Sequence, residues 1–112
     1  MNDKLQIAVR IKKTIIYIEK TLETFPHKYI EIKSLISKTM YEMLEYIYLA
    51  NTNIEREKNI SLSIVKLQMV DFYLLLAYKN ELISRKKYEG ISKHLLEIKN
   101  MMFGYKNYEK IQ

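Results

Sequence analysis

The side chains best suited to chemistry in this 112-residue chain fall into two groups, both mainly cationic. The first group recurs at helical spacing, on the side of its helix opposite the apolar residues, and includes a tyrosine: Arg10, Lys13, Tyr17 and Lys20. The second group crowds one short segment: Arg85, Lys86, Lys87 and Lys93. Cations neutralise the phosphates of a nucleic-acid backbone, and an aromatic ring offers an unstacked base a surface to lie on. We predict that these residues bind nucleic acid or an acidic partner. The alternative for a single row of lysines is an ordinary solvated helix face.

The chain as a whole is basic. It has 19 Lys and Arg residues against 13 Asp and Glu residues, which gives a formal net charge of +6. Such an excess attracts phosphates, an acidic protein surface or an anionic membrane, and net charge alone does not choose among them.

The sequence contains no pattern typical of an active site. A di-iron or di-manganese site in a helical bundle uses Glu-x-x-His pairs, but Thr24 precedes His27 and Ile91 precedes His94 at that spacing. There is no glycine-rich phosphate loop, no nucleophile elbow and no cysteine. We therefore predict a protein that is not an enzyme, with no catalytic residues, no metal and no cofactor.

Four segments with apolar residues at alternating three- and four-residue steps must position the cations. The first spans residues 3–25, with Asp3 and Gln6 as its cap and Pro26 as its end. The second spans 30–50, and the third begins at residue 55 or 56 and runs to 79. The fourth follows Ser84 as N-cap and stops at Gly104. Because the connections are short, we predict an all-α, up-down-up-down antiparallel four-helix bundle over residues 1–104, followed by a C-terminal tail over 105–112.

The third segment carries more apolar surface than one bundle needs. One face consists of Ile60, Ile64, Leu67, Val70 and Leu74. A second face consists of Leu62, Val65, Met69, Phe72 and Leu76. Monomers rarely expose large apolar patches, so we predict that a second copy of the chain covers this second face. The alternative is a monomer whose core surrounds the third helix on all sides.

Three further side chains of the second and third segments receive predictions. Tyr41 and Tyr48 lie one heptad apart on the outer side of the second helix, where we expect them to contact another subunit. Asp71, within the first face of the third helix, is expected to be buried and paired with a tyrosine or lysine.

A family resemblance spans nearly the whole chain. The segments that carry it are Phe25-Pro26, Lys38-Thr39-Met40-Tyr41-Glu42-Met43-Leu44-Glu45-Tyr46-Ile47, Ala50-Asn51, Tyr88-Glu89, Ile98 and Met101-Met102-Phe103-Gly104-Tyr105. In order and spacing they resemble the accessory variability determinant of diversity-generating retroelements, which belongs with the four-helix-bundle proteins encoded by 23S rRNA intervening sequences. The chain lacks the Asn-Ile-Ala-Glu-Gly segment of the rRNA-intervening branch, so the retroelement branch is closer. Tyr105 stands where a tryptophan is expected.

The resemblance implies a homopentameric barrel of four-helix bundles. It implies a scaffold without catalytic activity that binds the reverse transcriptase and the template RNA or cDNA, and so supports mutagenic reverse transcription. The alternative function is a protein–protein adaptor, or an rRNA intervening sequence protein, with no direct nucleic-acid role. We expect a cytoplasmic protein without a membrane partner, because the N-terminal segment lacks an apolar run and the most apolar stretch, residues 72–78, is short.

Overall fold

Four long helices follow one another in the computed structural model, which describes residues 3–111 and the side chains of residues 6–107. The helices are α1 (Asp3–Leu22), α2 (Ile30–Asn51), α3 (Arg56–Lys79) and α4 (Arg85–Ile111), and a short 3₁₀ helix, η1 (His27–Tyr29), precedes α2. Residues 3–111 contain no β-strand. The predicted all-α class and four-helix architecture are confirmed.

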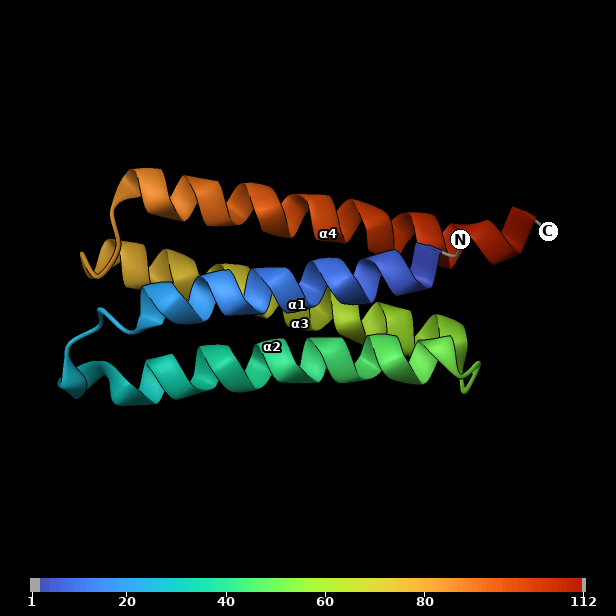
Figure 1. The fold of residues 1–112 in the computed structure, drawn as a ribbon, viewed down its shortest axis with the longest axis horizontal. Helices are drawn as coiled ribbons and strands as arrows, with labels where there is room; N and C mark the ends of the chain where they lie inside the picture. Colours follow the sequence, from blue (N-terminus) through green and yellow to red (C-terminus); the bar gives the residue numbers. More distant parts are fainter. Residues whose placement is uncertain (1–2, 112) are drawn as a thin grey trace.

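Each helix packs against two neighbours. α1 and α3 both contact α2 and α4, so α1 and α3 lie across the diagonal of the bundle. Figure 1 shows successive helices running in opposite directions, with the N- and C-terminal ends at the same end of the molecule. The last turn of α1 therefore lies at the same end of the bundle as the first turn of α4, although they are far apart in sequence.

The core forms along the predicted apolar rows, because residues three and four apart share one side of a helix. Each helix contributes fully buried side chains, among them Ile11, Ile18, Ile36, Met43, Ile60, Leu74, Ile91 and Leu95. α2 and α3 are also linked by polar contacts. The Ser63 hydroxyl donates to the Met43 carbonyl oxygen at 2.8 Å, and the ammonium of Lys66 lies 3.2 Å from the Glu42 carboxylate.

The first helix ends earlier than predicted. α1 stops at Leu22 rather than near residue 25, because a residue that precedes proline is disfavoured in helical conformation. The chain nevertheless stays against the bundle, since the Phe25 amide donates to the Leu22 carbonyl oxygen and the Phe25 side chain is buried. The predicted cap at Asp3 lies outside the side chains that the structure describes.

The predicted stop at Gly104 is wrong. α4 continues to Ile111, and the structure has no glycine with positive φ. The reason is Tyr105, which is 6% exposed and belongs to the core cluster. Its hydroxyl lies 3.1 Å from Asn51 Oδ1 and 3.4 Å from the Ala50 carbonyl oxygen, and the Arg56 guanidinium lies 4.2 Å from its ring centroid.

We expect Tyr105→Ala to destabilise the fold by about 3–5 kcal/mol, because it removes a buried aromatic ring that closes the α2–α3 end of the bundle. Tyr105→Phe keeps the ring and should cost only about 1 kcal/mol, the usual contribution of one hydrogen bond. Urea denaturation at one fixed protein concentration measures both. Equal stability of Tyr105→Ala and the parent chain would show that the last turns of α4 do not support the bundle.

The turn between α3 and α4 holds a strained residue. Glu81 adopts φ 61°, the left-handed conformation that glycine favours. The Leu82 amide donates to the Ala77 carbonyl oxygen and the Glu81 amide to that of Tyr78, which is the hydrogen-bond pattern of a Schellman helix end. The fold therefore imposes this conformation on a residue type that resists it.

Replacing Glu81 with glycine should raise the free energy of unfolding by about 0.5–1 kcal/mol, since relief of the left-handed strain exceeds the added entropy of the unfolded chain. The control is Glu23→Gly, outside a positive-φ position, which should give no stabilisation. Thermal melting of the two variants distinguishes the outcomes, and a lower melting temperature for Glu81→Gly would contradict the strain argument.

Candidate nucleic-acid interface

The two predicted cationic groups meet along the junction between α1 and α4. The ammonium of Lys87 lies 4.5 Å from the centroid of the Tyr17 ring, and His94 meets the same ring edge-on at 5.6 Å between centroids. Two turns from Tyr17 along α1, Arg10 pairs with Glu97 of α4. The first group therefore lies on the flank of α1 that faces α4, not opposite the core as predicted. We call the side of the bundle that carries both groups the α1/α4 surface.

The structure divides the predicted cations into two kinds. The two arginines are neutralised within the chain, Arg10 by Glu97 and Arg85 by Glu89 at 3.1 Å. The Arg85 pair is largely exposed, so it contributes little stability in water. The lysines form no ion pair among the described residues: Lys13, Lys20, Lys86, Lys87 and Lys93. The uncompensated positive charge of this surface therefore comes from lysines.

The lysines are not all gathered in one place. Lys20 and Lys87 both line a pocket between the last turn of α1 and the start of α4. Lys13, Lys86 and Lys93 are exposed, and none of them lines this pocket. We call the pocket that contains Lys20 and Lys87 the lysine pocket.

The lysine pocket has a volume of about 400 Å³. Its lining residues are Tyr17, Lys20, Thr21, Thr24, Leu82, Ile83, Ser84 and Lys87. None of them is acidic. The threonine hydroxyls donate to carbonyl oxygens of α1, Thr21 to Tyr17 at 3.4 Å and Thr24 to Thr21 at 2.8 Å. Residue type and spacing do not single out Thr21, Thr24, Leu82 or Ile83 as site residues, although the predicted antiparallel topology brings both helix ends together.

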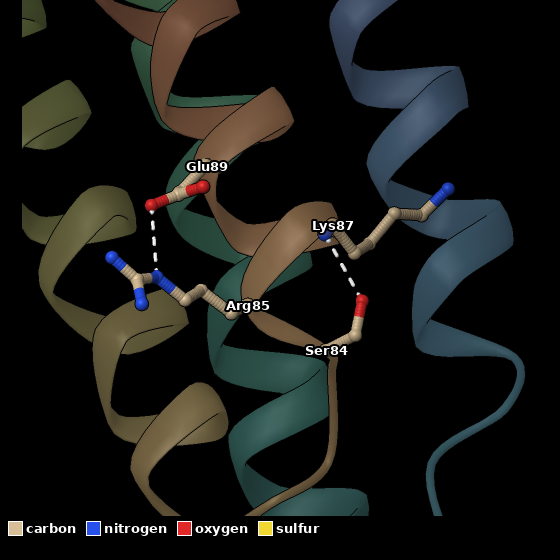
Figure 2. A network of polar contacts seen from close by, with 4 residues as sticks. All are labelled: Ser84, Arg85, Lys87 and Glu89. Atoms are coloured by element: carbon tan, nitrogen blue, oxygen red, sulfur yellow. Dashed lines mark hydrogen bonds and ion pairs between the residues drawn. The ribbon is translucent and has the colours of Figure 1, made fainter.

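Figure 2 shows how the first turn of α4 is built. The Ser84 hydroxyl oxygen accepts a hydrogen bond from the Lys87 amide at 3.0 Å, which confirms the predicted N-cap. The Lys87 side chain extends from α4 toward the neighbouring α1, while Arg85 turns to Glu89 on its own helix. The first turn contains no acidic residue, although a helix N-terminus favours negative charge. This end of α4 is therefore a concentration of positive charge.

Removing the cap with Ser84→Ala should destabilise the protein by about 1 kcal/mol, whereas Ser84→Gly should cost only a few tenths of that amount. The difference arises because glycine also tolerates the cap conformation and leaves the amide open to water. Urea denaturation of the two variants at equal concentration measures the difference. Unchanged stability of Ser84→Ala would mean that the serine hydroxyl does not stabilise the helix end.

The two faces of α3 differ in exposure as predicted. All five residues of the first face are buried in the core. On the second face, Val65 is 50% and Phe72 48% exposed, Met69 and Leu76 are exposed to a smaller degree, and Leu62 is partly buried. Coverage of this second face by another copy stays a prediction.

Apolar residues on both faces make α3 unusual in composition. It is the one helix of the described chain that is long and apolar enough to cross a membrane by length and composition, with a mean hydropathy of 1.6 over its most apolar window. The core helix of a soluble protein can have the same length and hydropathy. Within α3, Lys66 pairs with Glu42 and the Asp71 carboxylate accepts a hydrogen bond from Ser92 at 3.0 Å. The prediction for Asp71 was wrong, because its partner is a serine and it is only half-buried.

Tyr41 and Tyr48 are exposed on α2, but both also reach α1. The Tyr41 hydroxyl donates to the Glu19 carboxylate, and this hydrogen bond raises the pKa of Tyr41 above its ordinary value. The ammonium of Lys12 lies 6.0 Å from the Tyr48 ring centroid. Next to these contacts, Val9 and Ile16 are exposed on α1. The bundle thus has a second apolar surface, on the side of α1 and α2.

No three His, Cys, Asp or Glu side chains gather into a possible metal site within the described part of the chain. Comparison with known proteins finds no matching family model, no matching curated protein and no matching solved structure.

Proposed function

We propose that this protein is a non-catalytic accessory scaffold of a diversity-generating retroelement. In this role it binds the reverse transcriptase together with template RNA or cDNA and supports mutagenic reverse transcription. The observation that carries the proposal is the α1/α4 surface, where lysines from two helices form no ion pair with any described residue while Arg10 and Arg85 are neutralised. Uncompensated lysines beside a tyrosine suit a nucleic-acid backbone. The sequence resemblance supplies the identity of the element.

Assembly into a homo-oligomer, a pentamer by the resemblance, is part of the proposal. The second face of α3 and the apolar surface formed by Val9 and Ile16 lie on helices at opposite corners of the bundle. Two different apolar surfaces favour a head-to-tail contact, in which one copy's α3 covers the next copy's α1. Head-to-tail contacts close into rings when the rotation between copies permits it. A ring multiplies the charge of each +6 subunit and strengthens polyanion binding.

We place the second face of α3 in a subunit interface rather than in a bilayer, and the protein in the cytoplasm. The opposite face of α3 is buried against the other helices, and its two charged central residues have partners on neighbouring helices. A helix in lipid would carry those charges at high cost.

RNA binding at several salt concentrations tests the proposal. Single-stranded RNA should bind the purified protein, and the binding constant should fall as salt is added. A plot of its logarithm against the logarithm of the salt concentration should have a slope of about −0.7 for each phosphate neutralised. A reverse transcriptase encoded beside this gene should remain bound to the protein through purification. Absent or salt-insensitive RNA binding would exclude the direct nucleic-acid role. If the reverse transcriptase is then still retained, the protein is an adaptor.

A further inference from the structure

We infer that the lysine pocket binds one nucleotide of the RNA or cDNA strand, with the phosphate between Lys20 and Lys87 and the base against the apolar wall. This inference rests on the proposed function and adds to it a defined site, where the general α1/α4 surface offers only scattered charge. The charge, the lining and the size of the pocket each favour a nucleotide.

The charge of the pocket selects an anion. Lys20 and Lys87 approach from two different helices, and no carboxylate lines the pocket. Neither lysine has an ion-pair partner among the described residues. The ammonium of Lys87 is also held in place, because it lies 4.5 Å from the centroid of the Tyr17 ring, within cation–π range. A lysine that is held before binding loses less side-chain entropy when a phosphate arrives.

The lining selects an anion with a flat apolar part. Ile83 is buried, Leu82 is partly buried and Tyr17 adds an aromatic edge, so one wall of the pocket is apolar. The hydroxyls of Thr21 and Thr24 donate to carbonyl oxygens of α1, so what they offer a ligand is acceptor lone pairs. A nucleobase fits this combination, because it presents an apolar face together with amino donors. A bare phosphate would leave the apolar wall without a partner.

The size of the pocket agrees with a single nucleotide. About 400 Å³ lies within the range of small-molecule sites in proteins, roughly 300–1,000 Å³. The chain also provides a comparison. A second pocket of about 320 Å³ lies between α3 and α4, but it contains Asp71, whose carboxylate repels phosphate. Charge rather than volume therefore distinguishes the two pockets.

The test measures binding of AMP and of inorganic phosphate to the full chain by isothermal titration calorimetry. Two variants alter the pocket in different ways. Lys20→Gln with Lys87→Gln removes the cations, and Thr24→Trp fills the space without changing charge, since Thr24 is exposed at the rim. The control, Lys12→Gln with Lys38→Gln, removes the same charge from exposed positions outside the pocket.

AMP affinity should fall at least about tenfold in each pocket variant, as expected for the loss of a charge-assisted contact, and should stay within about twofold in the control. Inorganic phosphate should bind more weakly than AMP. The inference is overturned if either pocket variant binds AMP as well as the parent chain does. Equal affinity for phosphate and AMP would overturn the nucleotide as the occupant.

RNA binding, measured in parallel, separates this inference from the proposed function. If the parent chain binds RNA but not AMP, the pocket inference fails and the proposed function stands. If it binds AMP in the pocket but not RNA, the proposed function fails and the pocket stands as a site for a free nucleotide.

Discussion

Val65→Glu combined with Phe72→Glu is expected to convert the proposed oligomer into a single 13.5 kDa subunit. Both side chains are about half exposed in the lone bundle, so a carboxylate there meets water and leaves the core intact. In an assembled protein the same positions are covered, and an unpaired buried charge costs several kcal/mol. Two such charges at each contact exceed what an interface between small bundles can tolerate. Sedimentation velocity gives the mass, and circular dichroism checks that the helices persist.

Ile30→Glu with Leu35→Glu is the matched control. It adds the same charge to exposed apolar positions of α2 that lie outside both proposed contact surfaces, and the mass should not change. An unchanged mass for the Val65 and Phe72 variant would show that the second face of α3 is not an interface.

A mixing experiment tests the head-to-tail contact itself. Ile16→Glu alters only the α1 surface and should also give single subunits. Mixed with the Val65 and Phe72 variant, it should form a one-to-one dimer, because each partner then contributes one intact surface. A symmetric contact, in which α3 meets α3, predicts no recovery on mixing.

Reversing the charge of Lys13, Lys20 and Lys87 to glutamate is expected to have the second large effect, a loss of RNA affinity of at least about a hundredfold near physiological salt. The three substitutions bring the formal net charge from +6 to zero, and all three positions lie on the α1/α4 surface, where these lysines pair with no acidic residue within residues 6–107. Arg10 is left unchanged, since a glutamate there would face Glu97. Fluorescence anisotropy with labelled single-stranded RNA measures the affinity and its salt dependence.

The control for this prediction reverses Lys38, Lys58 and Lys79, which are exposed elsewhere and give the same net charge of zero. It should retain most of the RNA affinity. Equal losses in both triple variants would show that net charge, not the α1/α4 surface, attracts RNA. Unchanged RNA binding in the α1/α4 variant together with loss of reverse transcriptase binding would favour the adaptor.

The fold was largely predictable, because the periodicity of apolar residues and the residues that cap or end helices are local features of the sequence. Ser84 caps α4 as predicted, α2 ends at Asn51, one residue after its predicted end, and the two faces of α3 follow from side-chain spacing alone. The predicted helix end at Gly104 was wrong, since a glycine favours a helix end mainly where the chain adopts positive φ. The contacts of Tyr105 with Ala50 and Asn51, distant in sequence, keep that turn helical instead.

The candidate site was predictable in its residue types but not in its geometry. Periodicity shows that Arg10 and Lys20 share one side of a helix, but not which neighbouring helix that side faces. The pairing of Arg10 with Glu97 and the approach of Lys87 to Tyr17 depend on the antiparallel register of α1 and α4. The apolar wall of the lysine pocket depends on the tight turn between α3 and α4. The spacing of residues in the sequence does not determine the path of this turn.

Sedimentation equilibrium of the unmodified protein shows whether a second copy of the chain covers the exposed face of α3. We expect a concentration-independent mass several times that of the 13.5 kDa subunit, and five times the subunit mass for the proposed ring. A stable single subunit at high protein concentration would contradict it.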